Sequence, residues 1–300
     1  MTLLVLPAPG AEQVAAALAS HLQAPCGTVQ SRRFPDGETY LRIDDDVAGR
    51  DVVLVASLRD PDPQALGLWF VAATARELGA RRVGLVAPYL PYMRQDKRFQ
   101  PGEAVTSRIF ARFVSQQFDW LVTVDPHLHR FDTLSAIYTV PARAVASAAA
   151  VARWVAREVP NPVIVGPDSE SEQWASDVAR RVGCPWIVLA KTRLGDRSVE
   201  ITVPDAAPHH GRTPVLIDDI ISSARTMAVA VRQVRASFGV APVCIGVHAV
   251  FSPDAMQALR DAGAGRVVTC NTLPHETNAV DVLGDVAGAV RAMLAEGASR

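Results

Sequence analysis

The segment VLIDDIISSART, residues 215–226, brings carboxylates, hydroxyls and the start of a helical pattern together in one short stretch. Backbone N–H groups and hydroxyls at the N-terminus of a helix form a cradle for an anion. The adjacent carboxylates can accept hydrogen bonds from the vicinal hydroxyls of a sugar. The segment therefore suits a sugar phosphate, although an acidic strand end followed by a serine cap would have the same sequence. Its carboxyl and hydroxyl side chains are those of Asp218, Asp219, Ser222, Ser223 and Thr226.

Eight short runs rich in β-branched residues alternate with longer segments of helical periodicity. Continuous apolar runs of this kind are typical of strands that are buried on both faces of a parallel sheet. The alternation predicts a doubly wound α/β architecture. The runs begin at residues 2, 51, 82, 120, 162, 214, 243 and 266.

The number of predicted strands favours two domains over one. Eight or nine strands exceed the usual sheet of about five or six, and a helical pattern at about 145–158 separates two similar sets. We expect a first domain over residues 1–145 and a second over 146–300. Ligands of open α/β sheets bind beyond the carboxyl ends of the strands, where Asp125 and Asp168 also stand.

The composition is that of a globular chain without a strong charge bias. The 300 residues are 49% hydrophobic and 20% charged, and 30 basic against 31 acidic side chains give a net charge of -1. Such a balance creates no field that attracts nucleic acid. The four cysteines form no C-x-x-C pair, and neither an export signal nor a membrane-spanning run is present. We expect a cytoplasmic protein with no nucleic-acid or membrane partner.

Four motifs in register carry a resemblance to a known family. VLIDDIISSART resembles the phosphoribosyl-binding loop of the phosphoribosyltransferase fold. FPDGETYLRI, PYMRQDKRFQPGEAVT and TVDPHLHRF, which begin at residues 34, 91 and 123, resemble segments of ribose-phosphate pyrophosphokinases, and so does VVTCNTLPHE near the end. The resemblance implies two phosphoribosyltransferase-like domains, the first with the ATP-site motifs. It also implies transfer of the diphosphoryl group of Mg-ATP to O1 of ribose 5-phosphate, which gives phosphoribosyl pyrophosphate and AMP.

The resemblance assigns residues to each part of this reaction. It implies that ATP is bound by Phe34, Asp36, Gly37, Glu38, Arg94, Gln95 and Asp96. It implies that ribose 5-phosphate is bound by Arg193, Asp218, Asp219, Ser222, Ser223, Ala224, Arg225 and Thr226. It further implies that Lys191 and Arg193 are catalytic and that His127 and Asp168 bind Mg²⁺.

The chemistry of the reaction makes cations the main requirement. Diphosphoryl transfer gathers negative charge, so positioning and cationic stabilisation should supply most of the catalysis. Lys191 and Arg193 are two residues apart, a spacing that puts both side chains on one side of an extended chain. A solvated basic hairpin would have the same pattern. On ligand chemistry alone Asp125 is a better Mg²⁺ ligand than His127, which would then support the metal indirectly.

The ATP-site motifs also have simpler interpretations. FPDGE is a strong turn sequence, and RQDKRF is a charge run of the kind that usually lies in solvent. As an ATP site, FPDGE would offer the Phe34 ring to adenine, and Arg94 could grip a phosphate. By resemblance this loop reaches the ATP site of a neighbouring subunit, so activity would require a homo-oligomer.

One position departs from the family pattern. Arg225 stands where family members usually have Gly before the loop threonine, and a left-handed conformation there would cost about 1–2 kcal/mol relative to Gly. Two other functions remain open from the sequence: a phosphoribosyltransferase that consumes phosphoribosyl pyrophosphate, and an inactive regulatory paralogue of a synthetase.

Overall fold

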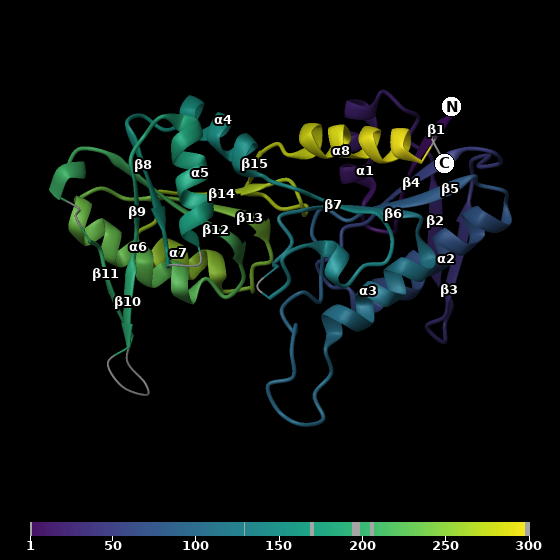
Figure 1. Cartoon of the computed structure of the whole chain (residues 1–300), viewed down its shortest axis with the longest axis horizontal. Helices are drawn as coiled ribbons and strands as arrows, with labels where there is room; N and C mark the ends of the chain where they lie inside the picture. The colour runs from purple at the N-terminus through teal and green to yellow at the C-terminus, as the bar shows by residue number, and fades with distance from the viewer. Residues whose placement is uncertain (1, 129, 169–170, 194–198, 205–206, 298–300) are drawn as a thin grey trace. The chain divides into compact units, whose positions relative to one another are not determined.

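The computed structural model describes residues 2–128, 130–168, 171–193, 199–204 and 207–297. For residues 191–193 and 199–202 it describes the backbone only. The chain divides into two compact units (Figure 1). Unit 1 comprises Met1–Val145, Thr272–Pro274 and Leu283–Arg300. Unit 2 comprises Ala146–Asn271 and His275–Val282.

Unit 1 is built on a five-stranded parallel sheet with the strand order β1-β4-β5-β6-β7. A separate antiparallel hairpin, β2–β3, follows the first helix. In Figure 1 the helix pair α1 and α8 and the pair α2 and α3 lie on opposite faces of the sheet. The elements are β1 (Leu3–Pro7), α1 (Glu12–Leu22), β2 (Val29–Arg33), β3 (Thr39–Ile43), β4 (Asp51–Val55), α2 (Asp62–Glu77), β5 (Arg82–Val86), α3 (Thr106–Gln117), β6 (Trp120–Val124), the 3-10 turn η1 (Leu134–Ala136), β7 (Ala142–Val145) and α8 (Leu283–Glu296).

Unit 2 is built on a six-stranded parallel sheet with the strand order β15-β14-β13-β12-β8-β9. It too has an antiparallel hairpin, β10–β11, which projects from the unit (Figure 1). Its elements are α4 (Ala148–Glu158), β8 (Pro162–Gly166), α5 (Glu172–Val182), β9 (Trp186–Val188), β10 (Ala190–Arg193), β11 (Val199–Thr202), the 3-10 turn η3 (Ala207–His209), β12 (Thr213–Ile221), α6 (Arg225–Phe238), β13 (Val243–Ala249), α7 (Ala255–Ala262), β14 (Arg266–Cys270) and β15 (Asn278–Val280).

The predicted doubly wound α/β architecture with mostly parallel sheets is confirmed. All five residues of β4 and all five of β6 are buried, as expected for strands covered on both faces. The eight predicted runs all form strands of the two sheets. Gly239 directly follows the last residue of α6 and has a left-handed φ of 69°. The position that stops the helix is thus taken by a residue without a Cβ.

The two units follow one plan. Each begins with a strand and a helix, which are followed by an edge strand or a single bridge and then by a hairpin. The chain next enters a second parallel strand, and further pairs of helix and strand follow. β1 pairs with β4 on one side and forms a single bridge through Val5 to Cys26 on the other. β8 likewise lies between β12 and β9. β1 and β4 of unit 1 therefore correspond to β8 and β12 of unit 2.

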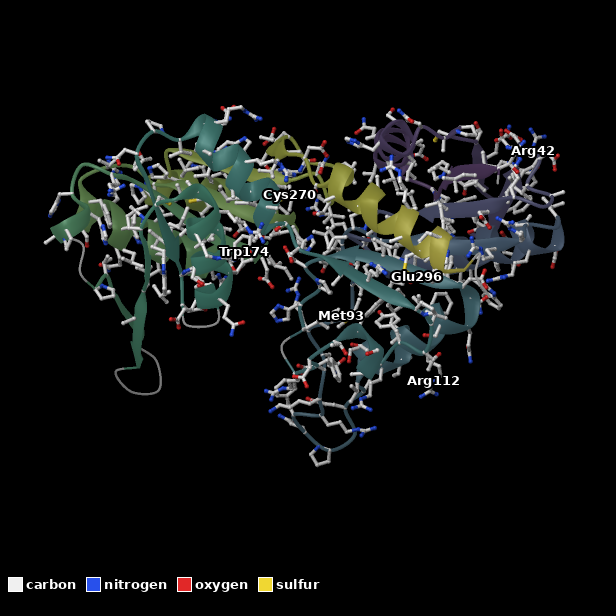
Figure 2. The ribbon with its side chains drawn as sticks, turned by 45° about the horizontal axis from the view of Figure 1, so that its top comes forward. Arg42, Met93, Arg112, Trp174, Cys270 and Glu296 are labelled. Carbon is white, nitrogen blue, oxygen red and sulfur yellow. The ribbon has the colours of Figure 1, made fainter. Side chains whose placement is uncertain are left out.

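The last helix of the chain packs on unit 1, not on the unit whose strands precede it. α8 contacts α1, β6 and β7. The Arg82 guanidinium donates a hydrogen bond to the Leu294 carbonyl (3.1 Å), and Glu296, labelled at the end of α8 in Figure 2, pairs with Arg143. The expected second domain, 146–300, therefore differs from unit 2 at residues 272–274 and 283–300. Within the described ranges, no helix is long and apolar enough to cross a membrane.

Candidate active site

Three carboxylates gather at the carboxyl edge of the sheet in unit 2. Asp218 and Asp219 lie in β12, and Asp168 follows the neighbouring strand β8. All three are half-buried. Burial, together with the negative charges of Asp219 and Asp168, raises the pKa of Asp218 to about 8. Mutual repulsion therefore disfavours the ionisation of all three carboxyl groups at once. The edge suits a ligand that donates hydrogen bonds or brings cations.

The loop after β12 leads directly into the N-terminus of α6. Ser223 and Thr226 are exposed and Ser222 is half-buried. No side chain of the described residues caps α6 by a hydrogen bond, so the N–H groups of its first turn stay available to a ligand. Hydroxyls and N–H groups thus surround one helix start next to the carboxylates, as the anion-cradle prediction requires.

The left-handed residue of this loop is Ala224, with φ 56° and ψ 7°. The expectation placed any left-handed strain at Arg225, which is instead the first residue of α6. The left-handed position therefore lies one residue earlier than expected, directly before α6. A Cβ at a left-handed position costs about 1 kcal/mol relative to Gly.

A second loop supports the first from the next strand. The Ser252 N–H donates to the Ser222 carbonyl (3.0 Å), and the Ser252 hydroxyl donates to Asp254 (2.6 Å). This hydroxyl bond, together with the positive charge of Arg225, lowers the pKa of Asp254. Sequence reasoning missed Ser252 and Asp254, since neither belongs to a motif. Proximity to the end of β13, the strand beside β12, was the signal that could have pointed to them.

The other predicted residues of unit 2 are placed less fully. The Ser171 hydroxyl donates to the Asp168 carbonyl (2.6 Å), and the Ser171 N–H reaches the Asp168 carboxylate (3.3 Å). Lys191 and Arg193 occupy alternate positions of β10, where Lys191 pairs with Ile201 of β11. Their side chains lie outside the described part of the chain.

In unit 1, FPDGE forms the turn of the β2–β3 hairpin. The Phe34 N–H donates to the Glu38 carbonyl (2.8 Å), the Glu38 N–H donates to Asp36 (3.1 Å), and Gly37 has a φ of 93°. Asp36 and Glu38 are exposed, and Phe34 is 38% exposed at the tip. Arg32, which sequence reasoning missed, lies 4.6 Å from the Phe34 ring centre. The turn interpretation is correct, and it leaves the predicted ATP-binding side chains open to a partner molecule.

The loops after β5 and β6 are tied together by an ion pair. Arg94 is exposed and Gln95 half-buried, but Asp96 is only 8% exposed and pairs with Arg130 (3.4 Å). The charge run is therefore partly built into the unit and does not simply lie in solvent. Asp96 links the two loops, and any contact with ATP would come in addition to this role.

Left-handed residues occur in both of these loops. Tyr92 has φ 61° and Asp125 has φ 31°. Non-glycine residues in this region are uncommon and concentrate at functional sites. Asp125 and His127 are both half-buried. The unusual backbone thus occurs beside the residues predicted to bind ATP and Mg²⁺.

The oxygen donors at this edge of unit 2 are of the type that a divalent cation prefers. No group of three or more His, Cys, Asp or Glu side chains among the described residues could hold a metal by itself. Mg²⁺ commonly uses one or two carboxylates, substrate phosphates and several waters, so a smaller set suffices. Asp168 and its acidic neighbours fit that requirement. His127 belongs to unit 1 and Asp168 to unit 2.

Comparison with known proteins identifies the family. Residues 3–117 match the N-terminal domain of ribose phosphate pyrophosphokinase, and residues 135–284 match the phosphoribosyl transferase domain. The chain is 36% identical over 276 residues to the ribose-phosphate pyrophosphokinase of Methanopyrus kandleri, covering 91% of this chain and 93% of the relative. The chain belongs to the ribose-phosphate pyrophosphokinase family.

Further relatives agree with this assignment. The ribose-phosphate pyrophosphokinase of Sulfolobus acidocaldarius is 32% identical over 265 residues, covering 85% of this chain and 88% of the relative. The crystal structure of phosphoribosylpyrophosphate synthetase from Mycobacterium smegmatis superposes with a TM-score of 0.84 at 25% identity, covering 99% of this chain and all of that one. The predicted family, fold and enzyme class of ribose-phosphate diphosphokinase are confirmed. Ribose-phosphate pyrophosphokinases generally use Mg-ATP.

Proposed function

We propose that this chain transfers the diphosphoryl group of Mg-ATP to O1 of ribose 5-phosphate through the residues described above. The supporting observation for the site is that β12, which carries Asp218 and Asp219 near its end, leads through a short loop with two serines to an uncapped helix N-terminus. That arrangement offers a sugar and its phosphate two different sets of partners within one loop.

The sugar end is served by the carboxyl groups of Asp218 and Asp219. With a pKa of about 8, Asp218 keeps its proton at neutral pH and can donate a hydrogen bond. Carboxyl oxygens accept hydrogen bonds, and the vicinal hydroxyls of a sugar can both donate and accept them. The phosphate end is served by the N–H groups of the α6 start and the loop hydroxyls. The proposed contacts to ribose 5-phosphate come from Asp218, Asp219, Ser222, Ser223, Ala224, Arg225 and Thr226.

The acidity of this edge explains why the reaction needs cations. The negative charge of this acidic edge repels the triphosphate of ATP, and charge builds further as the diphosphoryl group moves. Lys191 and Arg193 of the β10–β11 hairpin would bring two positive charges to the moving group. Asp168 and His127 would hold Mg²⁺, which supplies charge neutralisation between the ATP phosphates when bound.

The proposed ATP site uses residues of unit 1. Phe34 offers a ring for adenine, Asp36 and Glu38 offer acceptors for its amino group, and Arg94 with Gln95 can bind phosphate. The exposure of the FPDGE turn supports its insertion into a neighbouring subunit. The four cysteines are free thiols, as is usual for an enzyme that acts in the cytoplasm.

A complementation experiment tests the shared site. Phe34→Ala and Lys191→Ala should each be nearly inactive alone. If the turn of one subunit completes the site of another, subunits of the two variants mixed and reassembled should regain activity, because some sites then receive wild-type residues from both sides. A mixture no more active than its components would show that each site is built within one subunit.

Product identification tests the reaction itself. Phosphorus NMR of the protein with Mg-ATP and ribose 5-phosphate should show AMP and phosphoribosyl pyrophosphate forming in equal amounts. Formation of ADP would indicate a simple phosphoryl transfer, and the absence of nucleotide turnover would indicate an inactive paralogue. Either result would overturn the proposal.

A further inference from the structure

A cavity lies at the place in unit 1 that corresponds to the proposed sugar-phosphate site of unit 2. Ligands of open α/β sheets bind where the chain turns to opposite sides of a strand, beyond the carboxyl ends. In unit 2 that point lies between β8 and β12, and in unit 1 it lies between β1 and β4. A cavity of about 230 Å³ lies there, lined by residues that follow β1 and β4, by the β2–β3 hairpin and by the start of α2.

The wall of this cavity is mostly apolar. Leu58, which follows β4, lines it together with Pro63 and Leu68. Leu58 and Leu68 are each about 1% exposed. A cavity of about 150 Å³ with apolar walls is enough to bind benzene, so this one can hold a ring with a small substituent. Because no pair of carboxylates stands where Asp218 and Asp219 stand in unit 2, a sugar would find no matching acceptors here.

A glycine in the middle of a helix keeps the cavity open. Gly67 lies in α2 and lines the cavity, and it is buried. A Cβ built on it would nevertheless have no neighbour within 4 Å. Glycine is unfavourable inside a helix, and here its missing side chain leaves free volume next to Leu68.

One cation is fixed at the rim. The Arg33 guanidinium donates to the Gly37 carbonyl (2.8 Å) and to the Pro63 carbonyl (3.2 Å), so the hairpin is tied to the start of α2. A guanidinium has five N–H donors, and these bonds use two of them. Side chains alternate along β2, and Arg32 accordingly lies over Phe34 and not in the cavity wall.

We infer that unit 1 has a second binding site, for a small organic acid whose apolar body fills the cavity and whose single negative charge meets Arg33. One positive charge at the rim matches one negative charge on the ligand. Ser31, Thr39 and Gln64 also line the cavity and offer further hydrogen bonds to a carboxylate. The cavity adjoins the turn proposed for ATP, but none of its lining residues belongs to the proposed ATP, sugar-phosphate or metal sites, so the inference does not depend on the catalytic assignment.

Benzoate is the probe, because it combines a ring with one carboxylate. Saturation-transfer NMR on the full chain should detect benzoate with a Kd of about 1 mM, in the presence of saturating ribose 5-phosphate. Arg33→Met should weaken binding at least about tenfold by removing the charge, and Gly67→Met should abolish it by filling the cavity. Benzyl alcohol, which has the ring without the charge, should bind wild type at least about tenfold more weakly than benzoate.

Gly288→Met is the matched control, since Gly288 is also a helix glycine of unit 1 with open space around its Cβ position. It lines no part of this cavity and should leave benzoate binding unchanged. If Gly67→Met does not fold, as judged by its melting curve, Gly67→Ala adds a single methyl group and should weaken binding in the same direction. The inference is overturned if wild type shows no benzoate binding up to about 10 mM, or if binding survives both Arg33→Met and the Gly67 substitution.

Discussion

The chain leaves the corresponding strands of unit 1 and unit 2 through connections of very different composition. After β4 the chain passes through Leu58, Asp60 and Pro61 before α2 begins at Asp62. At the end of β12 it passes through two carboxylates and two serines, and α6 begins at Arg225. The strand order around the two connections is the same. The fold thus provides a turn at a fixed place, and the residues of that turn decide whether it can hold a sugar phosphate.

The pKa values of Asp51, which is buried, and of Asp218, which is half-buried, are shifted in opposite directions. Burial alone would raise the pKa of Asp51 in β4, but hydrogen bonds from Arg82 and Arg81 outweigh it and lower the pKa. Burial also acts on Asp218, where neighbouring carboxylates add to it and raise the pKa to about 8. Asp51 lies at the amino edge of its sheet and stabilises unit 1, whereas Asp218 lies at the carboxyl edge, where ligands bind.

The largest expected effect comes from the hairpin of unit 2. Lys191→Ala should lower kcat at least about 10²-fold, or about 3 kcal/mol, with ATP binding little changed, since the lost charge acts on the transferring group. Arg42→Ala removes a cation from the β2–β3 hairpin of unit 1, where Arg42 pairs with Asp44 at 2.6 Å. That control should change kcat by less than about twofold, because an exposed pair contributes little. Steady-state kinetics with both substrates distinguishes the two hairpins, and equal losses would remove the catalytic assignment.

The carboxylates of the two connections give the next contrast. Asp219→Ala should raise the KM for ribose 5-phosphate by about 10- to 100-fold, since hydrogen bonds to a charged group contribute about 1.5–3 kcal/mol. Asp60→Ala changes the corresponding connection of unit 1 and should leave this KM unchanged. The Gln64 side chain donates there to the backbone carbonyl of Asp60, which the substitution keeps. An effect of Asp219→Ala confined to the KM for ATP would contradict the assignment of this loop.

Asp51 and Asp218 should make the free energy of unfolding depend on pH in opposite directions. The lowered pKa of Asp51 means that its contribution is present above the unfolded pKa of about 3.9 and is lost as the pH falls. Asp51→Asn should therefore destabilise the protein by about 2 kcal/mol at pH 7, with a smaller loss toward pH 3, because Arg81 and Arg82 lose their partner but stay partly exposed.

Asp218 has the opposite sign. Between the unfolded pKa of about 3.9 and the folded value of about 8, the folded protein holds a proton that the unfolded chain releases, so stability falls as the pH rises. Asp218→Asn should thus gain stability relative to wild type from pH 5 to pH 8. Urea unfolding midpoints across this range measure both variants, and the same pH trend in the two would refute the contrast between these sites.

The sequence predicts the sheets well and the contacts between loops poorly. Strands such as β4 and β12 are buried on both faces, so an apolar run identifies them, but β2 is almost entirely exposed and gives no such signal. A helical periodicity shows that α8 has an apolar face without showing which sheet that face covers. The acidic strand ends predicted the site because parallel strands bring their ends together. The Asp96–Arg130 pair and the support from Ser252 join loops after neighbouring strands, and no local pattern encodes them.

The smallest expected effect sharpens the comparison at the two helix starts. Ala224 is left-handed, whereas Pro61 before α2 has the ordinary φ of -76°. Ala224→Gly should therefore raise the free energy of unfolding by up to about 1 kcal/mol, since glycine accepts this conformation without a Cβ penalty. Ala65→Gly in the first turns of α2 should lower it by a similar amount, because there the backbone is helical. Thermal melts of the two variants decide the point: a loss of stability in both would mean that Ala224 carries no strain, and that its methyl group, which is buried, contributes more than its conformation costs.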